Sequence, residues 1–397
     1  MTAPNTSLPS LFDADFFADP YAAYARLRAK GGVHLVAAPD GAPIWLVLRE
    51  RDVRAGLSDP RLSVNKAHST RGYRGFSLPP ALDANLLNMD DSDHLRLRRL
   101  VSKAFTPRRV EQLRTAIEAT AGRLADALVP GETNDLAALY ANPLPVTVIG
   151  DLLDVPAADR APFSSWVGTM IAPDHPAQVA EAVSAIHDFL SGLVAARRRT
   201  PGDDLLSALI TARDEGDKLS EDELVSLAFL ILMAGAENAQ HVITSGVLTL
   251  LQHPQHLQEL KADFRLLPDA VEEILRYAHP NQMAIRRFTL EDFEIDSTVI
   301  PKGETVMLCL GSAHRDPARY PDADRFDIHR EDKAHLAMGY GLHYCLGAAL
   351  ARTEVQTALA ALLHRFPRLR LAVPPNELRW RSSWRSRALR ELPVIVD

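Results

Sequence analysis

The chain has 397 residues, of which 47% are hydrophobic and 24% charged, and its formal net charge is −7. This composition is typical of a globular protein with a sizeable core, and the acidic balance argues against nucleic-acid binding. The two cysteines give no disulfide framework and fit a reducing compartment. No basic-then-apolar signal opens the chain, and the longest apolar run is about half of a bilayer span. We therefore expect a soluble cytoplasmic protein without membrane segments.

The first half of the chain predicts helices and one β-hairpin. Short β-type runs over 33–36 and 44–47 flank a Pro-Asp-Gly-Ala turn and predict the hairpin. Residues 60–88 are irregular and mixed, as in a long functional loop. Pro173 and Pro176 break the last helical pattern into two helices, with a turn over 172–176. The helical patterns cover 20–28, 92–104, 110–128, 134–154 and 158–199.

The second half is organised around one long helix. Ser220-Glu-Asp-Glu is a capping box, and the helix that it opens is expected to run to about Gln252, roughly 30 residues or ~48 Å. A helix so long and apolar should cross the middle of the molecule. Another helix is expected over 267–278, β-type pieces near 299–310 and the C-terminus, and irregular chain over 314–335. The predicted fold is mainly α with small β-sheets, in a single domain of residues 1–397.

Cys345 follows a glycine-rich stretch, Met338-Gly-Tyr-Gly-Leu-His-Tyr-Cys-Leu-Gly347. Three glycines in nine residues predict an irregular loop, and the Ala- and Leu-rich chain from Leu346 to about His364 predicts a helix. Free amides and the helix dipole at such a junction favour a thiolate. A small buried hydrophobe is the alternative for any lone cysteine.

Three further groups of residues have the right types for a functional site. His94 and Arg98 are one helical turn apart, and with Arg287 and His343 they would clamp two carboxylates, although unrelated surface charges fit each one alone. Glu273 and Arg276 are three apart on a predicted helix and would pair, with Arg325 as a third member; this motif alone is weak. The third group is Ala234-Gly235-Ala236-Glu237-Asn238 in the long helix, either a widened groove for a small ligand such as dioxygen or a packing glycine.

These motifs together resemble the soluble bacterial cytochrome P-450 family of haem-thiolate oxygenases over essentially the whole chain. Gly339-x-Gly341-x-His343-x-Cys345-x-Gly347 with Arg352 is similar to the family's cysteine loop, and Glu273-x-x-Arg276 lies about 70 residues upstream, as in the family. Ala234-Gly235-x-Glu237 resembles the oxygen-activation motif, and Asp93-His94-x-x-x-Arg98 the haem-contacting helix. Four motifs in the family's order and spacing make coincidence very improbable. The resemblance implies the cytochrome P-450 fold, with the long central helix over the haem.

By this resemblance the cofactor is haem b, and Cys345 is the axial thiolate ligand of its iron. A thiolate ligand favours O–O cleavage of bound oxygen. His94, Arg98, Arg287 and His343 would hold the haem propionates, and Gly235, Glu237 and Asn238 would serve oxygen activation. Glu273, Arg276 and Arg325 would form a structural network behind the cysteine loop. A zinc site at His343 and Cys345 is disfavoured, because no paired ligand motif accompanies them.

Two residues depart from the family pattern. Met338 stands where the family usually has Phe, which changes the contact near the sulfur. Asn238 stands where the family usually has Thr, and an amide orients a water but is a poor proton carrier. The predicted reaction is oxidation, by hydroxylation, of a small apolar or aromatic secondary metabolite. Asn238 favours an alternative, oxidative C–C or C–N coupling or cyclisation without oxygen insertion.

Substrate contacts can be named only by analogy with the family, and such residues are also ordinary core. The candidates are Leu87, Met89, Trp166, Met170, Ala234, Asn238, Met283, Ile285 and Trp384. The expected partners are dioxygen and, because no flavin or nicotinamide fingerprint is present, a ferredoxin with its ferredoxin reductase. A cluster of basic residues could bind an acidic ferredoxin, or it is simply part of the solvated surface. Its members are Arg96, Arg99, Lys103, Arg108 and Arg109. We expect a monomeric enzyme; the rival from another class is a haem sensor or carrier that never turns over.

Overall fold

The computed structural model describes residues 8–72, 78–171, 175–214 and 219–397. The chain packs into two compact units, each built from three separate segments. The first, here called the sheet unit, comprises Met1–Gly75, Glu272–Cys345 and Arg379–Arg390. The second, the helical unit, comprises Phe76–Val271, Leu346–Leu378 and Glu391–Asp397. Each unit is described by itself.

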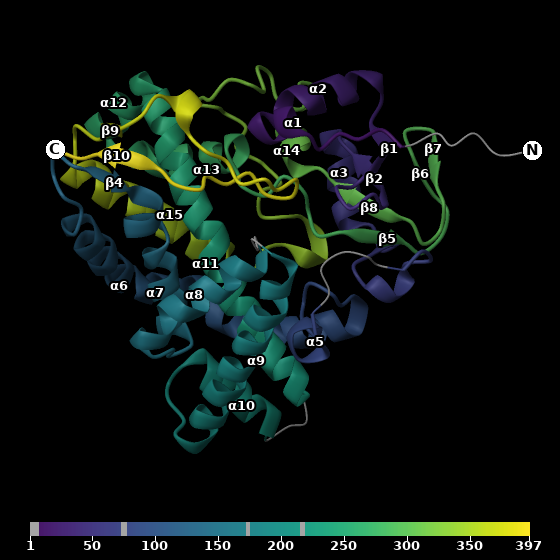
Figure 1. The fold of residues 1–397 in the computed structure, drawn as a ribbon, viewed down its shortest axis with the longest axis horizontal. Coiled ribbons are helices and arrows are strands. Elements are labelled where there is room, and N and C mark those ends of the chain that lie inside the picture. Colours follow the sequence, from purple (N-terminus) through teal and green to yellow (C-terminus); the bar gives the residue numbers. More distant parts are fainter. Residues whose placement is uncertain (1–7, 73–77, 172–174, 215–218) are drawn as a thin grey trace, which may run out of the picture. The chain divides into compact units, whose positions relative to one another are not determined.

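The sheet unit contains a five-stranded sheet in the order β1-β2-β8-β5-β3, in which only the β2–β8 pair is parallel. Its strands are β1 (Val33–Ala37), β2 (Pro43–Val47), β3 (Leu62–Ser63), β5 (Arg287–Thr289) and β8 (Thr305–Leu308), and a separate hairpin pairs β6 (Phe293–Ile295) with β7 (Thr298–Ile300). Figure 1 shows β1, β2, β8 and β5 near one another. The helices are α1 (Ala14–Ala18), α2 (Pro20–Lys30), α3 (Glu50–Ser58), α14 (Leu310–Ala313) and the 3₁₀ turns η1 (Lys66–His68) and η5 (Gly341–His343).

Local sequence explains the predicted parts of this unit. Asp19 caps α2 by accepting from the backbone N–H of Tyr21, and Pro20 occupies the first helical turn, where a missing N–H costs nothing. The predicted hairpin is confirmed, with Val33 opposite Val47 in an antiparallel register. The parallel pairing of Trp45 with Val306 joins segments about 260 residues apart and was beyond local sequence patterns.

The helical unit contains most of the helices and a three-stranded sheet in the order β4-β10-β9. Its longer helices are α5 (Asp91–Ser102), α6 (Pro107–Asp126), α7 (Pro143–Leu152), α8 (Ala157–Ile171), α9 (Pro176–Arg199), α10 (Leu205–Asp214), α11 (Glu221–Gln252), α12 (Pro254–Ala262) and α15 (Ala348–Arg365). The shorter elements are α4 (Pro80–Asp83), η2 (Lys103–Phe105), η3 (Ala137–Ala141), β4 (Thr133–Asp135), η4 (Phe264–Leu266), β9 (Arg370–Leu371), η6 (Pro375–Glu377) and β10 (Pro393–Ile395). Helix α13 (Leu267–Tyr277) begins in this unit and ends in the sheet unit. Of the turn predicted over 172–176, residues 172–174 lie outside the described residues.

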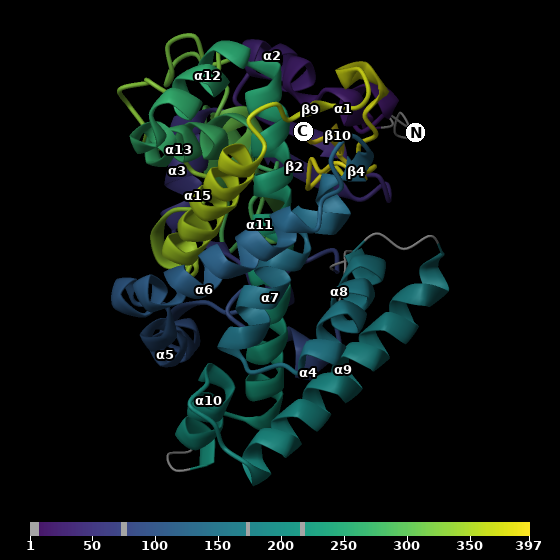
Figure 2. The same ribbon diagram turned by 90° about the vertical axis from the view of Figure 1, so that its left-hand side faces the viewer.

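Helix α11 forms the core of the helical unit, as its length predicts. The capping box is present, because Ser220 accepts from the N–H of Glu223 while the Glu223 carboxylate accepts from the N–H of Ser220. The helix packs against α4, α7, α9 and α15, and Figure 2 shows it beside α7. Helix α15 in turn packs along α6, and the buried hydroxyl of Tyr140 joins η3 to α15 through the carbonyl of Ala358.

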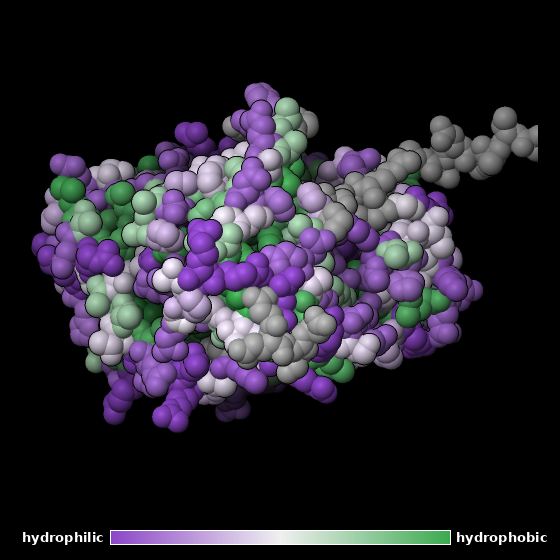
Figure 3. Space-filling model, turned by 90° about the horizontal axis from the view of Figure 1, so that it is seen from below, coloured by the Kyte–Doolittle hydropathy of each residue, from purple (hydrophilic) through white to green (hydrophobic). Residues whose placement is uncertain are grey.

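Among the described residues, two helices are long and apolar enough to span a membrane, α9 from Ala177 and α11. In α11, 61% of the apolar window is buried inside the protein, as in the core helix of a globular fold. Hydrophilic side chains predominate on the face drawn in Figure 3, with hydrophobic ones scattered among them. Core packing therefore accounts for the hydrophobicity of α11.

Candidate active site

The cysteine-bearing loop lies in the sheet unit, and its shape depends on glycine. It folds back on itself, because the backbone N–H of Cys345 donates to the carbonyl oxygen of Met338 at 2.7 Å. Gly339 and Gly341 have φ angles of 75° and 74°, a left-handed conformation that costs glycine nothing. A Cβ on Gly341 would also meet the Cβ of Ser58 at 2.9 Å, so α3 passes too close for a side chain there. The loop is thus a tight turn that ends at an exposed Cys345.

The two cysteines have opposite environments. Cys309 is completely buried, its sulfur lies 3.2 Å from that of Met283, and burial raises the pKa of its thiol. A thiol held neutral in this way is an inert part of the core. Cys345 is exposed, three residues before the first residue of α15, where the helix dipole favours a thiolate. The alternative of a buried hydrophobe therefore applies to Cys309 and not to Cys345.

Glu273 and Arg276 form a buried ion pair behind this loop, in the sheet unit. The Nε and Nη2 atoms of Arg276 donate to the two carboxylate oxygens of Glu273 at 2.7 and 2.8 Å, and both side chains are at most 3% exposed. The remaining nitrogen, Nη1, donates to the carbonyls of His314 and Ala323 at 2.7 and 2.8 Å. The guanidinium therefore fastens the chain that precedes the cysteine loop to α13.

The third member of this network is Arg330, and the prediction of Arg325 is wrong. The side chain of Arg325 is 64% exposed and pairs with Asp327 at 3.5 Å; only its backbone carbonyl accepts from Arg276. The Nε atom of Arg330 lies 3.4 Å from the Glu273 carboxylate, and its side chain is 11% exposed. Both arginines lie in irregular chain, so residue type and spacing did not distinguish them.

The middle of α11 differs from the rest of this buried helix. Residues 224–232 and 241–250 are buried, whereas Ala234 is exposed and 235–238 are half-buried. This stretch is therefore an accessible part in the middle of an otherwise buried helix. Gly235 also has a packing role, because a Cβ there would meet Cδ1 of Ile149 on α7 at 2.7 Å. Both alternatives considered for this glycine are thus compatible with the helix.

One residue near this stretch was missed by the sequence reasoning. His241 lies one turn after Glu237, its side chain is 3% exposed, and its Nε2 is 3.7 Å from the Glu237 carboxylate. The signal was available, since a histidine four residues after an acid on a helix lies on the same face. The helix therefore places an imidazole beside the acidic residue that the motif singled out.

The four predicted carboxylate-binding residues are divided between the units. In the helical unit, His94 and Arg98 project one turn apart from α5, His94 fully buried and Arg98 half-buried. In the sheet unit, Arg287 is buried on β5 and donates to the carbonyl of Ile285 at 2.9 Å, and His343 is half-buried on the cysteine loop. Each unit thus contains one histidine and one arginine of the predicted set.

Comparison with known proteins identifies the family. A family model described as Cytochrome P450 matches residues 162–382, more than half of the chain. The chain belongs to the cytochrome P450 family. It is 45% identical over 383 residues to the cytochrome P450 monooxygenase PikC of Streptomyces venezuelae, covering 96% of this chain and 92% of that one.

Solved P450 structures are similar over almost the entire chain. The tirandamycin C-bound P450 monooxygenase TamI has a TM-score of 0.93 at 43% identity, covering 98% of this chain and 100% of that one. The P450 CxnD, described as acting in C–S bond formation in chuangxinmycin biosynthesis, has a TM-score of 0.88 at 37% identity and covers 97% of each chain. These likenesses confirm the predicted fold class. This P450 is therefore an enzyme, which sets aside the sensor or carrier.

The P450 family implies a haem held by a cysteine thiolate, and the residues present fit that group. Cys345 belongs to no group of three His, Cys, Asp or Glu ligand atoms among the described residues. A thiolate without neighbouring protein ligands does not complete a zinc tetrahedron, but it would suit an iron whose other ligands come from a macrocycle. The surroundings of Cys345 are therefore compatible with the haem that the family implies.

The predicted substrate contacts of this P450 fall into two groups. Leu87, Met89 and Trp166 are partly buried and pack on the same core cluster of the helical unit as the buried Met170. In the sheet unit, Met283 is buried and Trp384 packs on the same cluster, against the ring of Phe12 at 5.0 Å. Met170 and Met283 thus also serve as core residues. Ile285 is half-buried. Ala234 and Asn238 belong to the accessible stretch 234–238 of α11.

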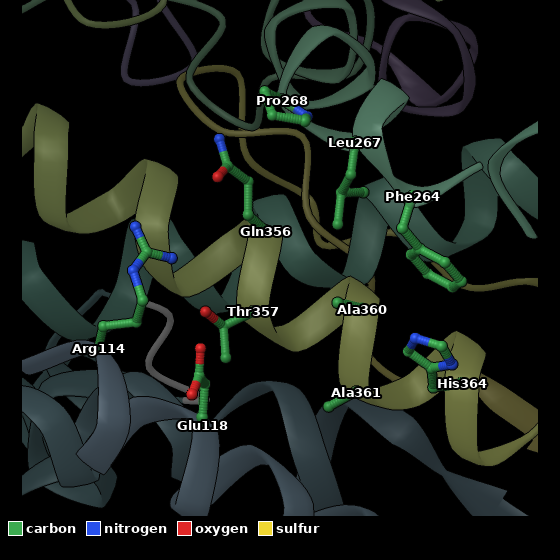
Figure 4. A pocket seen from close by; sticks show the side chains of 10 residues that line it. All are labelled: Arg114, Glu118, Phe264, Leu267, Pro268, Gln356, Thr357, Ala360, Ala361 and His364. Atoms are coloured by element: carbon green, nitrogen blue, oxygen red, sulfur yellow. The ribbon is translucent and has the colours of Figure 1, made fainter. Parts of the chain in front are cut away.

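A pocket of about 360 Å³ lies elsewhere in the helical unit, among α6, η4, the start of α13 and α15. Figure 4 shows its lining, with Arg114 and Glu118 on α6 and, across the pocket, the Phe264 ring near that of His364. The two rings stack at 4.2 Å. None of the predicted site residues lines this pocket, so it is separate from the candidate active site.

Proposed function

We propose that Cys345 is the axial thiolate ligand of a haem iron and that this P450 oxidises a small apolar or aromatic secondary metabolite. The observation that carries the proposal is the exposed Cys345 at the end of a glycine loop, in a chain whose other cysteine is buried. When bound, haem b supplies oxygen activation, which the thiolate assists by donating electron density. We treat residues 1–397 as one functional domain.

His94, Arg98, Arg287 and His343 bind and orient the haem propionates. Arg287 is buried and Arg98 is half-buried, and such guanidinium groups bind carboxylates strongly because the pairing is charge-assisted and poorly screened. His94 and His343 can each donate a ring N–H to a carboxylate. The burial of His94 and Arg287 supports the assignment, because these side chains are already desolvated in the folded protein before a carboxylate binds. Their part is to fix the cofactor and keep its carboxylates neutralised.

The accessible stretch of α11 provides the oxygen- and substrate-facing surface. The small, exposed side chain of Ala234 leaves room beside the helix, Glu237 holds and releases a proton at its carboxylate, and Asn238 orients a water through its amide. Leu87, Met89, Trp166, Met170, Met283, Ile285 and Trp384 complete an apolar lining. The names of PikC and TamI as monooxygenases support hydroxylation as the reaction.

Asn238 favours a second candidate reaction, oxidative coupling or cyclisation without oxygen insertion. An amide does not readily give up its own proton, so delivery of protons at this position depends on water or on the substrate. The similarity to CxnD, described as acting in C–S bond formation, supports this second candidate. Oxygen from labelled dioxygen in the product would support hydroxylation, and its absence would support coupling.

The electrons come from a ferredoxin and its reductase, and the enzyme works as a cytoplasmic monomer. Arg99, Lys103, Arg108 and Arg109 are exposed and provide a basic surface for an acidic ferredoxin, whereas Arg96 is already paired with Glu223. The attraction should weaken with salt. A screen for compounds that change the haem spin state, followed by product identification, tests the substrate class directly; no response to any apolar or aromatic candidate would contradict it.

A further inference from the structure

The chain that leads into the cysteine loop is held in place by hydrogen bonds. Gly339 donates its backbone N–H to the carbonyl of Leu336 at 2.9 Å, and Cys345 donates to the carbonyl of Met338. Leu336 and Met338 are buried. The conformation of residues 336–338 is therefore coupled directly to the position of Cys345, within the sheet unit.

Two consecutive amides in this stretch donate to the rings of two histidines. The N–H of Leu336 donates to Nε2 of His314 at 3.0 Å, and the N–H of Ala337 donates to Nδ1 of His335 at 3.2 Å. Both side chains are at most 3% exposed, and their rings meet edge to face at 6.1 Å. In this buried segment the imidazole nitrogens accept the backbone N–H groups, a role that carbonyl oxygens usually fill.

These contacts fix the tautomers of both rings. A ring nitrogen that accepts an N–H carries no proton, so neutral His314 has its proton on Nδ1 and neutral His335 on Nε2. The Nε2 atom of His335 lies 3.1 Å from the Glu272 carboxylate and donates to it. Burial, and then the positive charges of neighbouring groups including Arg276, lowers the pKa of His314 well below its usual range. The His314 ring therefore stays neutral, and its Nε2 can accept the N–H of Leu336.

We propose that His314 and His335 are positioning residues for the ligand Cys345, and that Glu272 holds His335 in the tautomer that accepts from Ala337. The inference rests on the proposed role of Cys345. Removal of a ring acceptor leaves a buried amide without its partner, which is costly, so the peptides around Ala337 and Met338 turn to find another. The Met338 carbonyl moves with them, and the N–H of Cys345 loses the partner that holds the sulfur in place.

Asparagine and glutamine distinguish this role from simple packing. The Oδ1 atom of Asn reproduces the position of Nδ1, and the side-chain amide of Gln reproduces that of Nε2. At position 335, His335→Asn should keep the bond to Ala337, and His335→Gln should lose it. At position 314 the order reverses, because there the accepting atom is Nε2: His314→Gln should keep the bond to Leu336 and His314→Asn should lose it. His34→Asn is the control, since its ring bonds carbonyls of Leu27 and Gly31 elsewhere in the unit.

The test uses the full-length haem-loaded protein and two measurements. Hydrogen exchange at single-residue resolution should be roughly five- to tenfold faster at Ala337 in His335→Gln and at Leu336 in His314→Asn, as expected for one lost hydrogen bond. The thiolate-type spectrum of the reduced carbon monoxide complex should also decay faster in these two variants. His335→Asn, His314→Gln and His34→Asn should match the natural protein in both.

Equal exchange in all variants, or equal damage from Asn and Gln at both positions, would overturn the proposal. The proposal would also be overturned if exchange were faster only in His335→Gln and His314→Asn but the spectrum were unchanged in both. The two amides would then not determine the position of the Cys345 sulfur. If the natural protein itself lacked the thiolate-type spectrum, the proposed role of Cys345 would fail instead. The exchange pattern would still show whether the histidines hold the two amides.

Discussion

The sheet unit and the helical unit differ in how a buried carboxyl group is held. In the sheet unit the buried Glu273 and Arg276 satisfy each other, and Arg276 also bonds the carbonyl of His314. In the helical unit Glu354 is 1% exposed on α15, and its Oε1 has no hydrogen-bond partner among the described residues. A buried carboxyl without a partner is tolerated only in its neutral form. The unit that carries the cysteine is thus fixed by paired charges, while the other contains a group that must stay protonated.

The two units also contain buried titratable groups whose responses to pH are opposite. Burial lowers the pKa of His279 in the sheet unit to about 3 and that of His314 well below 6.5. The unfolded chain takes up these protons first, so the sheet unit loses stability as the pH falls below 6.5. In the helical unit, burial raises the pKa of Glu354 from 4.5 to about 8. The unfolded chain there releases its proton first, so the helical unit loses stability as the pH rises from 4.5 to 8.

The largest effect on stability is expected from the paired charges of the sheet unit. Arg276→Leu would leave Glu273 buried without its main partner, which should lower the free energy of unfolding by about 3–5 kcal/mol. Arg330→Gln removes the longer contact of Arg330 with the Glu273 carboxylate and should lower the free energy of unfolding by less. Arg325→Gln should stay within about 0.5 kcal/mol, because this side chain is largely exposed. Urea unfolding of the three variants measures the order.

The Arg325 and Arg330 variants form a matched pair that tests which of the two arginines is the third member of the network with Glu273 and Arg276. Each loses one arginine from the same irregular segment. If Arg325→Gln proved more damaging than Arg330→Gln, the network would have the composition predicted from the sequence, and the contact between Arg330 and Glu273 would be unimportant.

An intermediate effect, dependent on pH, is expected for Glu354→Gln in the helical unit. The substitution removes the carboxyl group whose deprotonation the folded protein opposes, so its benefit grows as the pH rises from 4.5 to 8. The variant should therefore gain stability relative to the natural protein at pH 8–9 and show no such gain at pH 5. Thermal unfolding at both pH values measures this, with Glu377→Gln at an exposed position of the same unit as control. A gain independent of pH would show that Glu354 is not protonated by burial.

The smallest effect on stability, but a clear one on chemistry, is expected at Asn238. Asn238→Thr restores a hydroxyl that can pass a proton, and on the half-buried stretch of α11 it should change the free energy of unfolding by no more than about 0.5 kcal/mol. The amount of product per reductant consumed should change severalfold. Asn238→Ala, which supplies neither amide nor hydroxyl, is the control. Identical coupling in all three proteins would show that protons arrive by another route.

Elements with local signals were predictable from the sequence, and long-range partners were not. The capping box of α11, the hairpin and the loop-to-helix junction at Cys345 are short-range patterns, and all three are confirmed. Helix α3 was not predicted, although Val53, Gly56 and Leu57 recur at the spacing of one helical face. The choice of Arg330 over Arg325 and the histidine contacts to Leu336 and Ala337 depend on how distant segments meet, and no local pattern encodes that.

The assignment of Cys345 is tested most directly by the spectrum of the reduced protein with carbon monoxide. The natural protein should show the thiolate-type spectrum, because the exposed Cys345 is placed to ligate the iron. Cys345→Ser should abolish this spectrum, whereas Cys309→Ser, at the buried cysteine, should retain it in whatever protein folds. A thiolate-type spectrum in Cys345→Ser would contradict the account.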